Sequence, residues 1–530
     1  MAWSRGQLSM QTCLCKLPDF SRWVSLQKAS FAAAASIAEQ SSHAREDHHQ
    51  QQAAASSIEV SGMRNWVRAA LLGALGAAEL LVSAVLHVGY AFYIFGTAVA
   101  ADVSAFLVEG LAAGGVAKDV AVEGEDEAAS LLDGAVPPIV LVHGIFGFGK
   151  GRLGGLSYFA GAEKKDDRVL VPDLGSLTSV HDRARELFYC LKGGQVDYGE
   201  EHSKEYCHAR FGRTYKRGHY PVWDADHPVH FVGHSAGAQV IRLLQQMLHD
   251  REFEGHDGTS ESWVLSVTSL SGALNGSTRA YIDGMRPEDG GRSMRPVCLL
   301  QVCRVGSILY HWLDLPWLKR YYDFGFDHFG MSRRLVGVAG LADLLLGTDR
   351  WGPFATGDWI LPDLTIQGAA RINARARTFP GTFYFSYASR RTARARGATV
   401  PSGLLRIHPL LFLRVLQMCR WRYPASVEPP YQGYRDEYWE DNDGALNTFS
   451  MTHPRIPIEH PGLLVEDDAD CHPLRPGVWY YRIVEADHMT FVINRRRGGV
   501  QFDLVYDSIF HNCRRHVVRT APPPTLPNQS

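Results

Sequence analysis

The chain has 530 residues, of which 45% are hydrophobic and 21% charged, so it can bury a large core. Its formal net charge of −2 gives no electrostatic reason to expect a nucleic-acid partner. The nine cysteines are dispersed and form no metal-type C-x-x-C pair, which argues against a disulfide framework. No protein partner can be inferred from these totals.

The first segment, residues 1–60, is rich in Ala, Ser and Gln. This composition is typical of an organellar transit peptide and equally of a disordered tail. The segment is therefore expected to lie outside the folded domain.

Residues 61–110 contain a hydrophobic segment, and no residue between Leu80 and Ala101 is charged. As a helix, this run is long enough to cross a hydrocarbon core of about 30 Å. We expect a membrane anchor, with a helix that lies in the interface or packs on the domain as the alternative. An endomembrane location follows as an expectation, the endoplasmic reticulum foremost and the chloroplast as the alternative.

Residues 111–136 are small, polar and acidic and predict a linker to a domain over residues 137–520. Buried-strand runs are expected at residues 137–142 and 264–270, and a further strand begins near Leu170. Strands that alternate with helical segments predict an α/β fold, with a mostly parallel sheet covered by helices on both faces. The proline-rich residues 521–530 are expected to form a tail.

The most informative motif is Gly233-His234-Ser235-Ala236-Gly237, a G-x-S-x-G sequence. A strand-like run precedes it at residues 229–232, and helically spaced apolar residues follow it at residues 239–248. Such a strand–turn–helix exposes the Oγ of the central serine, and the glycines permit the tight turn. The motif predicts that Ser235 is a catalytic nucleophile.

A nucleophilic serine needs a base, a carboxylate that orients the base, and donors for the oxyanion. In hydrolases with this elbow the acid and then the histidine follow the serine in the chain. Acids crowd residues 440–443, where Asp443 precedes a glycine, and His488 follows a strand-like run. Asp443 and His488 are the predicted acid and base, and the backbone N–H groups of Ile145 and Ala236 the predicted oxyanion donors.

Two stretches carry a resemblance to a known family: residues 175–184, GSLTSVHDRA, and residues 193–215, which contain GGQVDYG and HARFGRTY. With the elbow, the acid loop and the histidine loop, the domain resembles the large zinc-containing lipases of the α/β-hydrolase fold. This group comprises bacterial thermoalkalophilic lipases and related plant hydrolases. The resemblance implies an α/β-hydrolase fold with a zinc-binding insertion and a lid.

The resemblance also implies a zinc site formed by Asp182, His202, His208 and Asp327. Two carboxylates and two imidazoles close a tetrahedral zinc shell without an open position, which is typical of a structural metal. Spacing alone does not identify this site, and Cys207 beside His208 offers a competing soft ligand.

The chain departs from the family at the calcium site. Thr490 and Arg495 occupy the positions where the family has a glutamate and an aspartate. Calcium requires anionic oxygen ligands, and an arginine repels it. No calcium site is therefore expected.

The segment from Val297 to Phe326 is rich in Leu, Trp, Tyr and Ile. Simple core packing explains this composition, whereas the resemblance implies a lid helix over the site.

Together these features predict a membrane-associated serine ester hydrolase that cleaves lipid esters through an acyl-enzyme. An acyltransferase that uses the same acyl-enzyme remains open, as does a non-catalytic, membrane-tethered interaction domain.

Overall fold

The computed structural model describes residues 70–71, 73–100, 103–104, 136–466, 474–493 and 495–516. The expected tail at 1–60, nearly all of the linker at 111–136 and the terminal segment 521–530 lie outside these residues. The chain divides into two compact units, Met1–Val82 and Ser83–Ser530.

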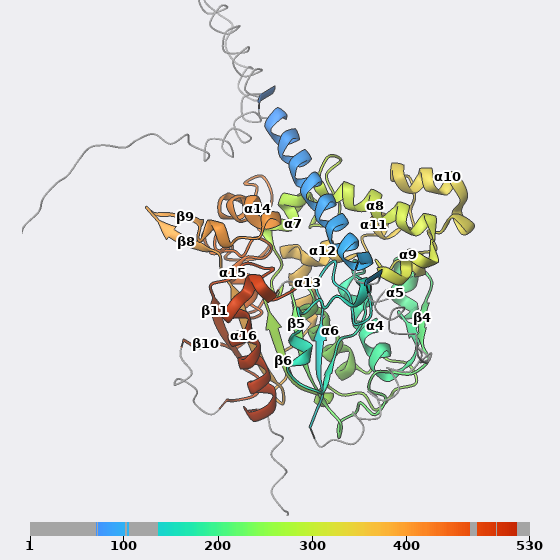
Figure 1. The fold of residues 1–530 in the computed structure, drawn as a ribbon, viewed down its shortest axis with the longest axis vertical. Helices are drawn as coiled ribbons and strands as arrows, with labels where there is room; N and C mark the ends of the chain where they lie inside the picture. The colour runs from blue at the N-terminus through green and yellow to red at the C-terminus, as the bar shows by residue number, and fades with distance from the viewer. Residues whose placement is uncertain are drawn as a thin grey trace, which may run out of the picture. The chain divides into compact units, whose positions relative to one another are not determined.

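A seven-stranded sheet with the strand order β10-β11-β7-β6-β5-β1-β2 forms the centre of the second unit (Figure 1). Every paired neighbour in it is parallel, which confirms the expected α/β class. The strands in chain order are β1 (Ile139–Val142), β2 (Val169–Leu170), β5 (Val229–His234), β6 (Val264–Leu270), β7 (Phe383–Ser389), β10 (Gly462–Leu464) and β11 (Trp479–Val484).

Both faces of the sheet are buried, and this explains the uninterrupted apolar runs of its strands. In β1, Val140 and Val142 belong to one hydrophobic cluster, whereas Ile139 and Leu141 belong to the other.

Helices cover both clusters, with α4 and α6 on one side and α16 on the other. The helices are α4 (Val180–Lys192), α5 (Glu200–Glu205), α6 (Gly237–Asp250), α7 (Thr278–Asp283), α8 (Leu299–Leu313), α9 (Pro316–Tyr321), α10 (Arg333–Leu346), α11 (Pro353–Thr356), α12 (Ile360–Leu364), α13 (Ile366–Arg375), α14 (Pro409–Arg420), α15 (Thr448–Thr452) and α16 (Arg495–His511). Two antiparallel hairpins stand apart from the sheet: β3 (Gly194–Asp197) with β4 (Phe211–Tyr215), and β8 (Thr392–Ala395) with β9 (Ala398–Pro401).

The expected hydrophobic helix is present as Gly73–Ala100, and its length and apolar composition would allow it to cross a membrane. Only 6% of its most apolar window is buried. Its residues from Ser83 onward belong to the second unit.

The helix α6 begins where the backbone passes very close to the end of β1. A Cβ on Gly237 would lie 2.3 Å from the carbonyl oxygen of Val142 and 2.9 Å from that of His143. Backbone atoms cannot yield as a flexible side chain would, so this position requires glycine.

Gly237→Ala should therefore lower the free energy of unfolding by about 1–3 kcal/mol, because the added methyl group overpacks this contact. Gly306→Ala is the matched control, since Gly306 lies inside α8 with open space around its Cβ position. That control should raise the stability by about 0.5–1 kcal/mol through helix propensity. Urea unfolding of both variants measures the difference, and equal effects would contradict the packing argument.

Candidate active site and metal cluster

The G-x-S-x-G motif forms a tight turn between β5 and α6. Ser235 has a φ of 56°, a left-handed conformation that is uncommon for a residue other than glycine. Its backbone N–H donates to the carbonyl oxygen of Leu270 at 3.1 Å. The strand before the turn and the helix after it are those expected from the sequence, and they fix Ser235 at the carboxyl edge of the sheet.

The structure brings the predicted acid and base together. His488 Nδ1 lies 2.8 Å from Asp443 Oδ2, and the His488 N–H donates to the Asp443 carbonyl oxygen at 3.1 Å. The second carboxylate oxygen of Asp443 accepts the N–H groups of Ala445 and Leu446 at 2.9 and 2.8 Å. The Asp443 carboxylate is fully buried and can orient the His488 ring.

The other acids of the same cluster have different partners. Glu440 forms an ion pair with Arg422 at 2.6 Å, and Asp441 accepts the hydroxyl of Thr392 at 2.7 Å. Of these acids, Asp443 is the one whose carboxylate contacts His488.

His488 lies beside the serine turn. The ring of His234, the residue before Ser235, has its centroid 4.8 Å from that of His488. Ser235 and His488 are 4% and 7% exposed, so the site is closed to a substrate in this conformation.

The loop after β1 lies directly against the serine turn. A Cβ on Gly144 would lie 2.7 Å from the Cβ of Ser235. The Phe146 N–H donates to the Ser176 carbonyl at 3.2 Å. Among the described residues, by contrast, the N–H groups of Ile145 and Ala236 donate no backbone hydrogen bond. These two N–H groups, on neighbouring segments, suit an oxyanion.

A buried arginine supports this loop from α4. The Arg183 guanidinium is fully buried and donates to the carbonyl oxygens of His143 and Gly144. Burial lowers the pKa of Arg183 to about 10, so its cation persists at neutral pH. Sequence reasoning missed Arg183, because its role depends on a contact between segments that are far apart in the chain.

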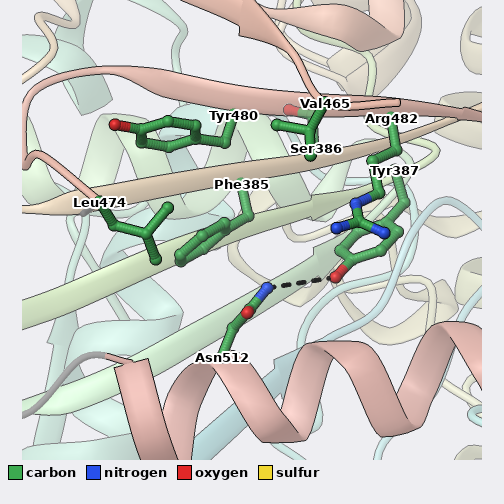
Figure 2. Close-up of a pocket in the computed structure, with 8 residues that line it drawn as sticks. All are labelled: Phe385, Ser386, Tyr387, Val465, Leu474, Tyr480, Arg482 and Asn512. Carbon is green, nitrogen blue, oxygen red and sulfur yellow. Dashed lines mark hydrogen bonds between the residues drawn. The ribbon is translucent and has the colours of Figure 1, made fainter. Parts of the chain in front are cut away.

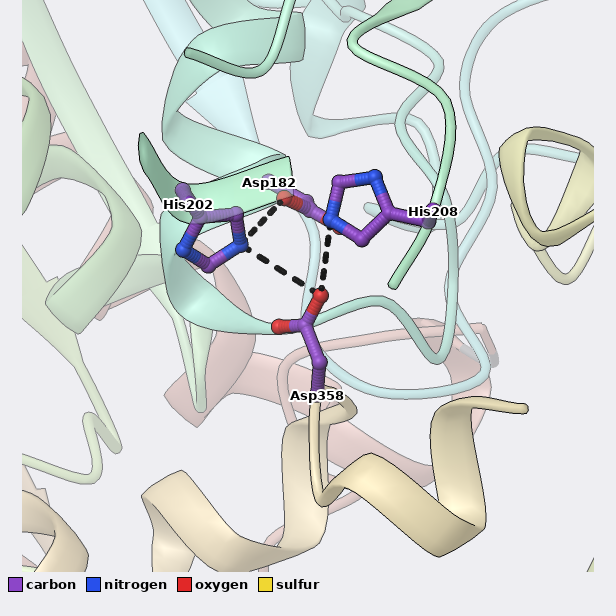
Figure 3. Close-up of side chains that lie close together, drawn as sticks. All are labelled: Asp182, His202, His208 and Asp358. Carbon is purple, nitrogen blue, oxygen red and sulfur yellow. Dashed lines mark ion pairs between the residues drawn. The ribbon is translucent and has the colours of Figure 1, made fainter. Parts of the chain in front are cut away.

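The residue before Arg183 belongs to a cluster of potential metal ligands. Asp182, His202, His208 and Asp358 each offer a ligand atom within 4.8 Å of the others (Figure 3). His202 Nε2 lies 3.2 Å from Asp182 Oδ1 and 3.3 Å from Asp358 Oδ2. His208 Nε2 lies 3.3 Å from Asp358 Oδ2.

The donor set fits a metal ion. The Nε2 atoms of His202 and His208 and one oxygen of Asp358 are buried without a hydrogen-bond partner. His208 Nδ1 lies 2.9 Å from the Ala209 carbonyl oxygen, which fixes its proton there and turns the lone pair of Nε2 toward the cluster. His328 Nε2 contacts the outer oxygen of Asp182 at 3.0 Å.

The sequence-based prediction of Asp327 as the fourth ligand is wrong in this structure, and Asp358 takes that position. Asp327 begins a short 3-10 helix, and its largely exposed carboxylate pairs with Lys319 at 2.7 Å and His311 at 3.3 Å. Asp358 lies in the turn before α12 and reaches the cluster only through the fold. No spacing pattern in the sequence identifies it.

Thr490 and Arg495, at the two positions discussed for calcium, both contact other side chains. The Thr490 hydroxyl donates to Asp487 Oδ1 at 2.9 Å, and Arg495 pairs with Asp503 at 2.7 Å.

The predicted lid segment forms α8 and α9, and it is not simply core. Several of its apolar side chains are exposed by at least 37%: Val302, Val305, Leu309, Leu313 and Trp317.

The lining residues of two hollows include neither Ser235 nor His488. The first, of about 30 Å³, lies between β7, β11 and the chain after α16, where Asn512 donates to the Tyr387 hydroxyl at 3.3 Å (Figure 2). It has room for about one water molecule. The second, of about 420 Å³, is lined mainly by polar and charged residues, among them Arg391, Glu485 and Asp487. Neither suits an acyl chain.

Known proteins resemble this chain in both sequence and structure. Residues 136–261 match the family described as "Lipase-like, C-terminal domain". The chain is 27% identical to the Lipase of Staphylococcus hyicus over 410 residues, which cover 72% of this chain and 57% of that protein. It is also 27% identical to Lipase 2 of Staphylococcus aureus over 408 residues, 71% of this chain and 54% of that protein. The chain thus spans little more than half of these curated relatives.

Solved structures agree with the sequence comparison. The crystal structure of the S. hyicus lipase has a TM-score of 0.54 at 27% identity, and the match covers 71% of this chain and 94% of that one. The structure of EstA from Clostridium botulinum has a TM-score of 0.55 at 25% identity, with 73% and 89% covered.

These relatives correct the expected location. The curated matches are lipases of staphylococci, bacteria that contain neither an endoplasmic reticulum nor chloroplasts. The endomembrane and chloroplast expectations are therefore wrong. They depended on the composition of residues 1–110, most of which the structure does not describe.

The parallel sheet, the serine turn, the Asp443–His488 pair and the similarity of sequence and structure agree with one another. The folded part of this chain has an α/β-hydrolase fold and is similar in sequence and structure to bacterial lipases.

Proposed function

We propose that the chain is a serine hydrolase that cleaves carboxylic esters of lipids through an acyl-enzyme. The observation that carries the proposal is the Asp443–His488 pair beside the left-handed Ser235 turn. The names of the relatives support an ester as the substrate class.

In the proposed reaction, Ser235 Oγ attacks the ester carbonyl carbon while His488 Nε2 takes the hydroxyl proton. The oxyanion accepts the N–H groups of Ile145 and Ala236, and Asp443 stabilises the imidazolium. The C–O bond to the alcohol then breaks, and His488 returns the proton to the departing alcohol. Water repeats the sequence on the acyl-enzyme and releases the fatty acid.

A closed site requires a movement before substrate can enter. We propose that α8 and α9 form the lid, because they combine buried and exposed apolar side chains. Opening would turn this apolar surface toward the acyl chain and the lipid around it.

Ser235→Ala tests the nucleophile. We expect kcat/KM for p-nitrophenyl esters to fall by at least roughly 10³-fold and fluorophosphonate labelling to disappear. Ser386→Ala is the matched control, because it removes another buried serine hydroxyl, in β7, and should leave both readouts unchanged.

Wild-type protein that neither hydrolyses these esters nor reacts with the probe would refute the enzyme and favour an interaction domain. A long-chain alcohol added to the same assay distinguishes a hydrolase from an acyltransferase. A hydrolase releases mainly free fatty acid, whereas an acyltransferase forms mainly the new ester.

We propose that the ion held by Asp182, His202, His208 and Asp358 is zinc. Two imidazoles and two carboxylates suit zinc, and four protein ligands leave no position for substrate. When bound, the ion supplies a cross-link rather than a reacting group. It joins α4, the α5 region and the segment before α12.

Asp358→Asn should remove zinc, whereas Asp327→Asn should retain it, because only Asp358 lies in the cluster. Elemental analysis should find about one zinc per wild-type chain. The melting temperature of Asp358→Asn should fall by several degrees, as should that of wild-type protein treated with a chelator. Zinc retained in Asp358→Asn but lost from Asp327→Asn would contradict the assignment.

We also propose that the helix Gly73–Ala100 contacts a lipid surface. Its stripe of Ser83, His87, Tyr90, Ile94 and Ala98 recurs at helical spacing and is turned toward the domain. Arg414 donates to the Ser83 hydroxyl at 3.4 Å, and the Tyr90 and His408 rings lie 5.2 Å apart.

The opposite side of this helix is apolar and exposed. Val85, Leu86, Val88, Phe92 and Tyr93 are each at least 41% exposed. The polar side chains of this helix already have partners in the domain, while its apolar face is directed away from the domain. This arrangement favours contact with lipid.

The double variant Val85→Glu/Phe92→Glu should bind phosphatidylcholine vesicles roughly tenfold or more weakly, because two apolar contacts become charges. Cosedimentation measures this effect. Ile458→Glu/Val500→Glu is the control, since both residues are 75% exposed and neither belongs to the helix Gly73–Ala100. Equal losses in the two variants would show that charge alone, not this face, governs binding.

A further inference from the structure

One chain of hydrogen bonds joins the three segments that meet at Ser235. The Gly144 N–H donates to the Tyr158 hydroxyl at 3.2 Å, and this hydroxyl lies 2.9 Å from His234 Nδ1. His234 Nε2 lies 3.3 Å from the carbonyl oxygen of His488. Tyr158 and His234 are both buried, at 5% and 1% exposure.

The chemistry of the groups fixes the position of each proton in this series of hydrogen bonds. The His488 carbonyl can only accept, so His234 carries its proton on Nε2. His234 Nδ1 then offers a lone pair, and the Tyr158 hydroxyl donates to it while accepting the Gly144 N–H. Burial, with His488 nearby, lowers the pKa of His234 well below its usual value, so the ring stays neutral.

Each end of this series of hydrogen bonds lies at a group that the proposed reaction uses. Gly144 precedes Ile145, whose N–H is a proposed oxyanion donor. The carbonyl at the other end belongs to His488, the proposed base. His234, in the middle, is bonded covalently to Ser235, so the three parts share a single connection.

We propose that Tyr158 and His234 are positioning residues for acyl transfer, which fix the oxyanion loop and the His488 backbone relative to Ser235. Neither residue gains or loses a proton in the reaction. The assignment rests on the proposed function, because it concerns the spacing of the groups that act on the ester.

Packing alone is the competing explanation for Tyr158. Its ring meets Phe148 and Phe159 edge to face, with centroids 5.7 and 5.0 Å apart. Tyr158→Phe keeps these ring contacts and removes only the hydroxyl, so it separates the two explanations.

Tyr384→Phe is the matched control. The Tyr384 hydroxyl is also buried, accepts the Phe379 N–H at 3.0 Å and donates to Gln245 Oε1 at 2.9 Å. The Tyr384→Phe variant therefore loses the same kinds of hydrogen bond at a position away from Ser235.

The experiment compares kcat, KM and melting temperature of the full chain on a soluble p-nitrophenyl ester. Tyr158→Phe should lower kcat roughly 5- to 20-fold with KM changed less than about twofold, since alignment rather than binding is lost. Tyr384→Phe should lower the melting temperature by about as much as Tyr158→Phe does. Its kcat should stay within about twofold of the wild-type value.

Two His234 variants supply a graded test. His234→Gln keeps an amide N–H that can reach the His488 carbonyl, whereas His234→Phe removes both hydrogen bonds. We expect kcat to decrease from wild type through His234→Gln to His234→Phe. The double variant Tyr158→Phe/His234→Phe should match His234→Phe alone, because the chain is already broken.

The proposal is overturned if Tyr158→Phe and Tyr384→Phe both leave kcat unchanged, or if the Tyr158→Phe and His234→Phe losses multiply. In either case the proposed function still stands if the wild-type protein is active and Ser235→Ala is inactive. A wild type without esterase activity or fluorophosphonate labelling overturns both proposals.

Discussion

The close packing of the β5–α6 turn against the end of β1 is the constraint on which the site depends. Only hydrogen fits at Gly237 and Gly144, where a Cβ would meet the Val142 carbonyl or Ser235 itself. This contact sets the loop after β1 beside the serine. Because the carboxyl ends of parallel strands share one edge, the loop after β11 then brings His488 to the same place. The strained φ of Ser235 is maintained by that packing on both sides.

The cluster of potential metal ligands and the loop after β1 are linked through one helix, α4. Asp182 and Arg183 are consecutive on α4, yet Asp182 faces the metal ligands while Arg183 reaches the carbonyls of His143 and Gly144. An ion held by Asp182 would therefore also restrain the helix that supports the loop. In this way a metal without an open position can contribute to the precision of a distant site.

The N-terminal helix has the reverse of the usual amphipathic arrangement. Its polar and small side chains at Ser83, His87 and Tyr90 face the domain, and its apolar side chains face outward. Tyr90 contacts His408, whose N–H donates to Asp487, the neighbour of His488. At the other end, the rings of Phe95 and Tyr321 of α9 have centroids 5.8 Å apart. The same helix thus contacts both α9 and His408, which is bonded to the loop that carries His488.

The sequence by itself determined what local patterns encode. The apolar runs predicted the parallel strands, and the flanking strand and helix made the motif at Ser235 credible. Order along the chain and loop context selected Asp443 and His488, which the fold then brings to 2.8 Å. Tertiary structure alone decided the contacts between distant segments. Asp358 rather than Asp327 joins the potential metal ligands, Arg183 supports the loop after β1, and His234 links Ser235 to His488. Such contacts depend on which side chains converge after packing, and no local periodicity records that convergence.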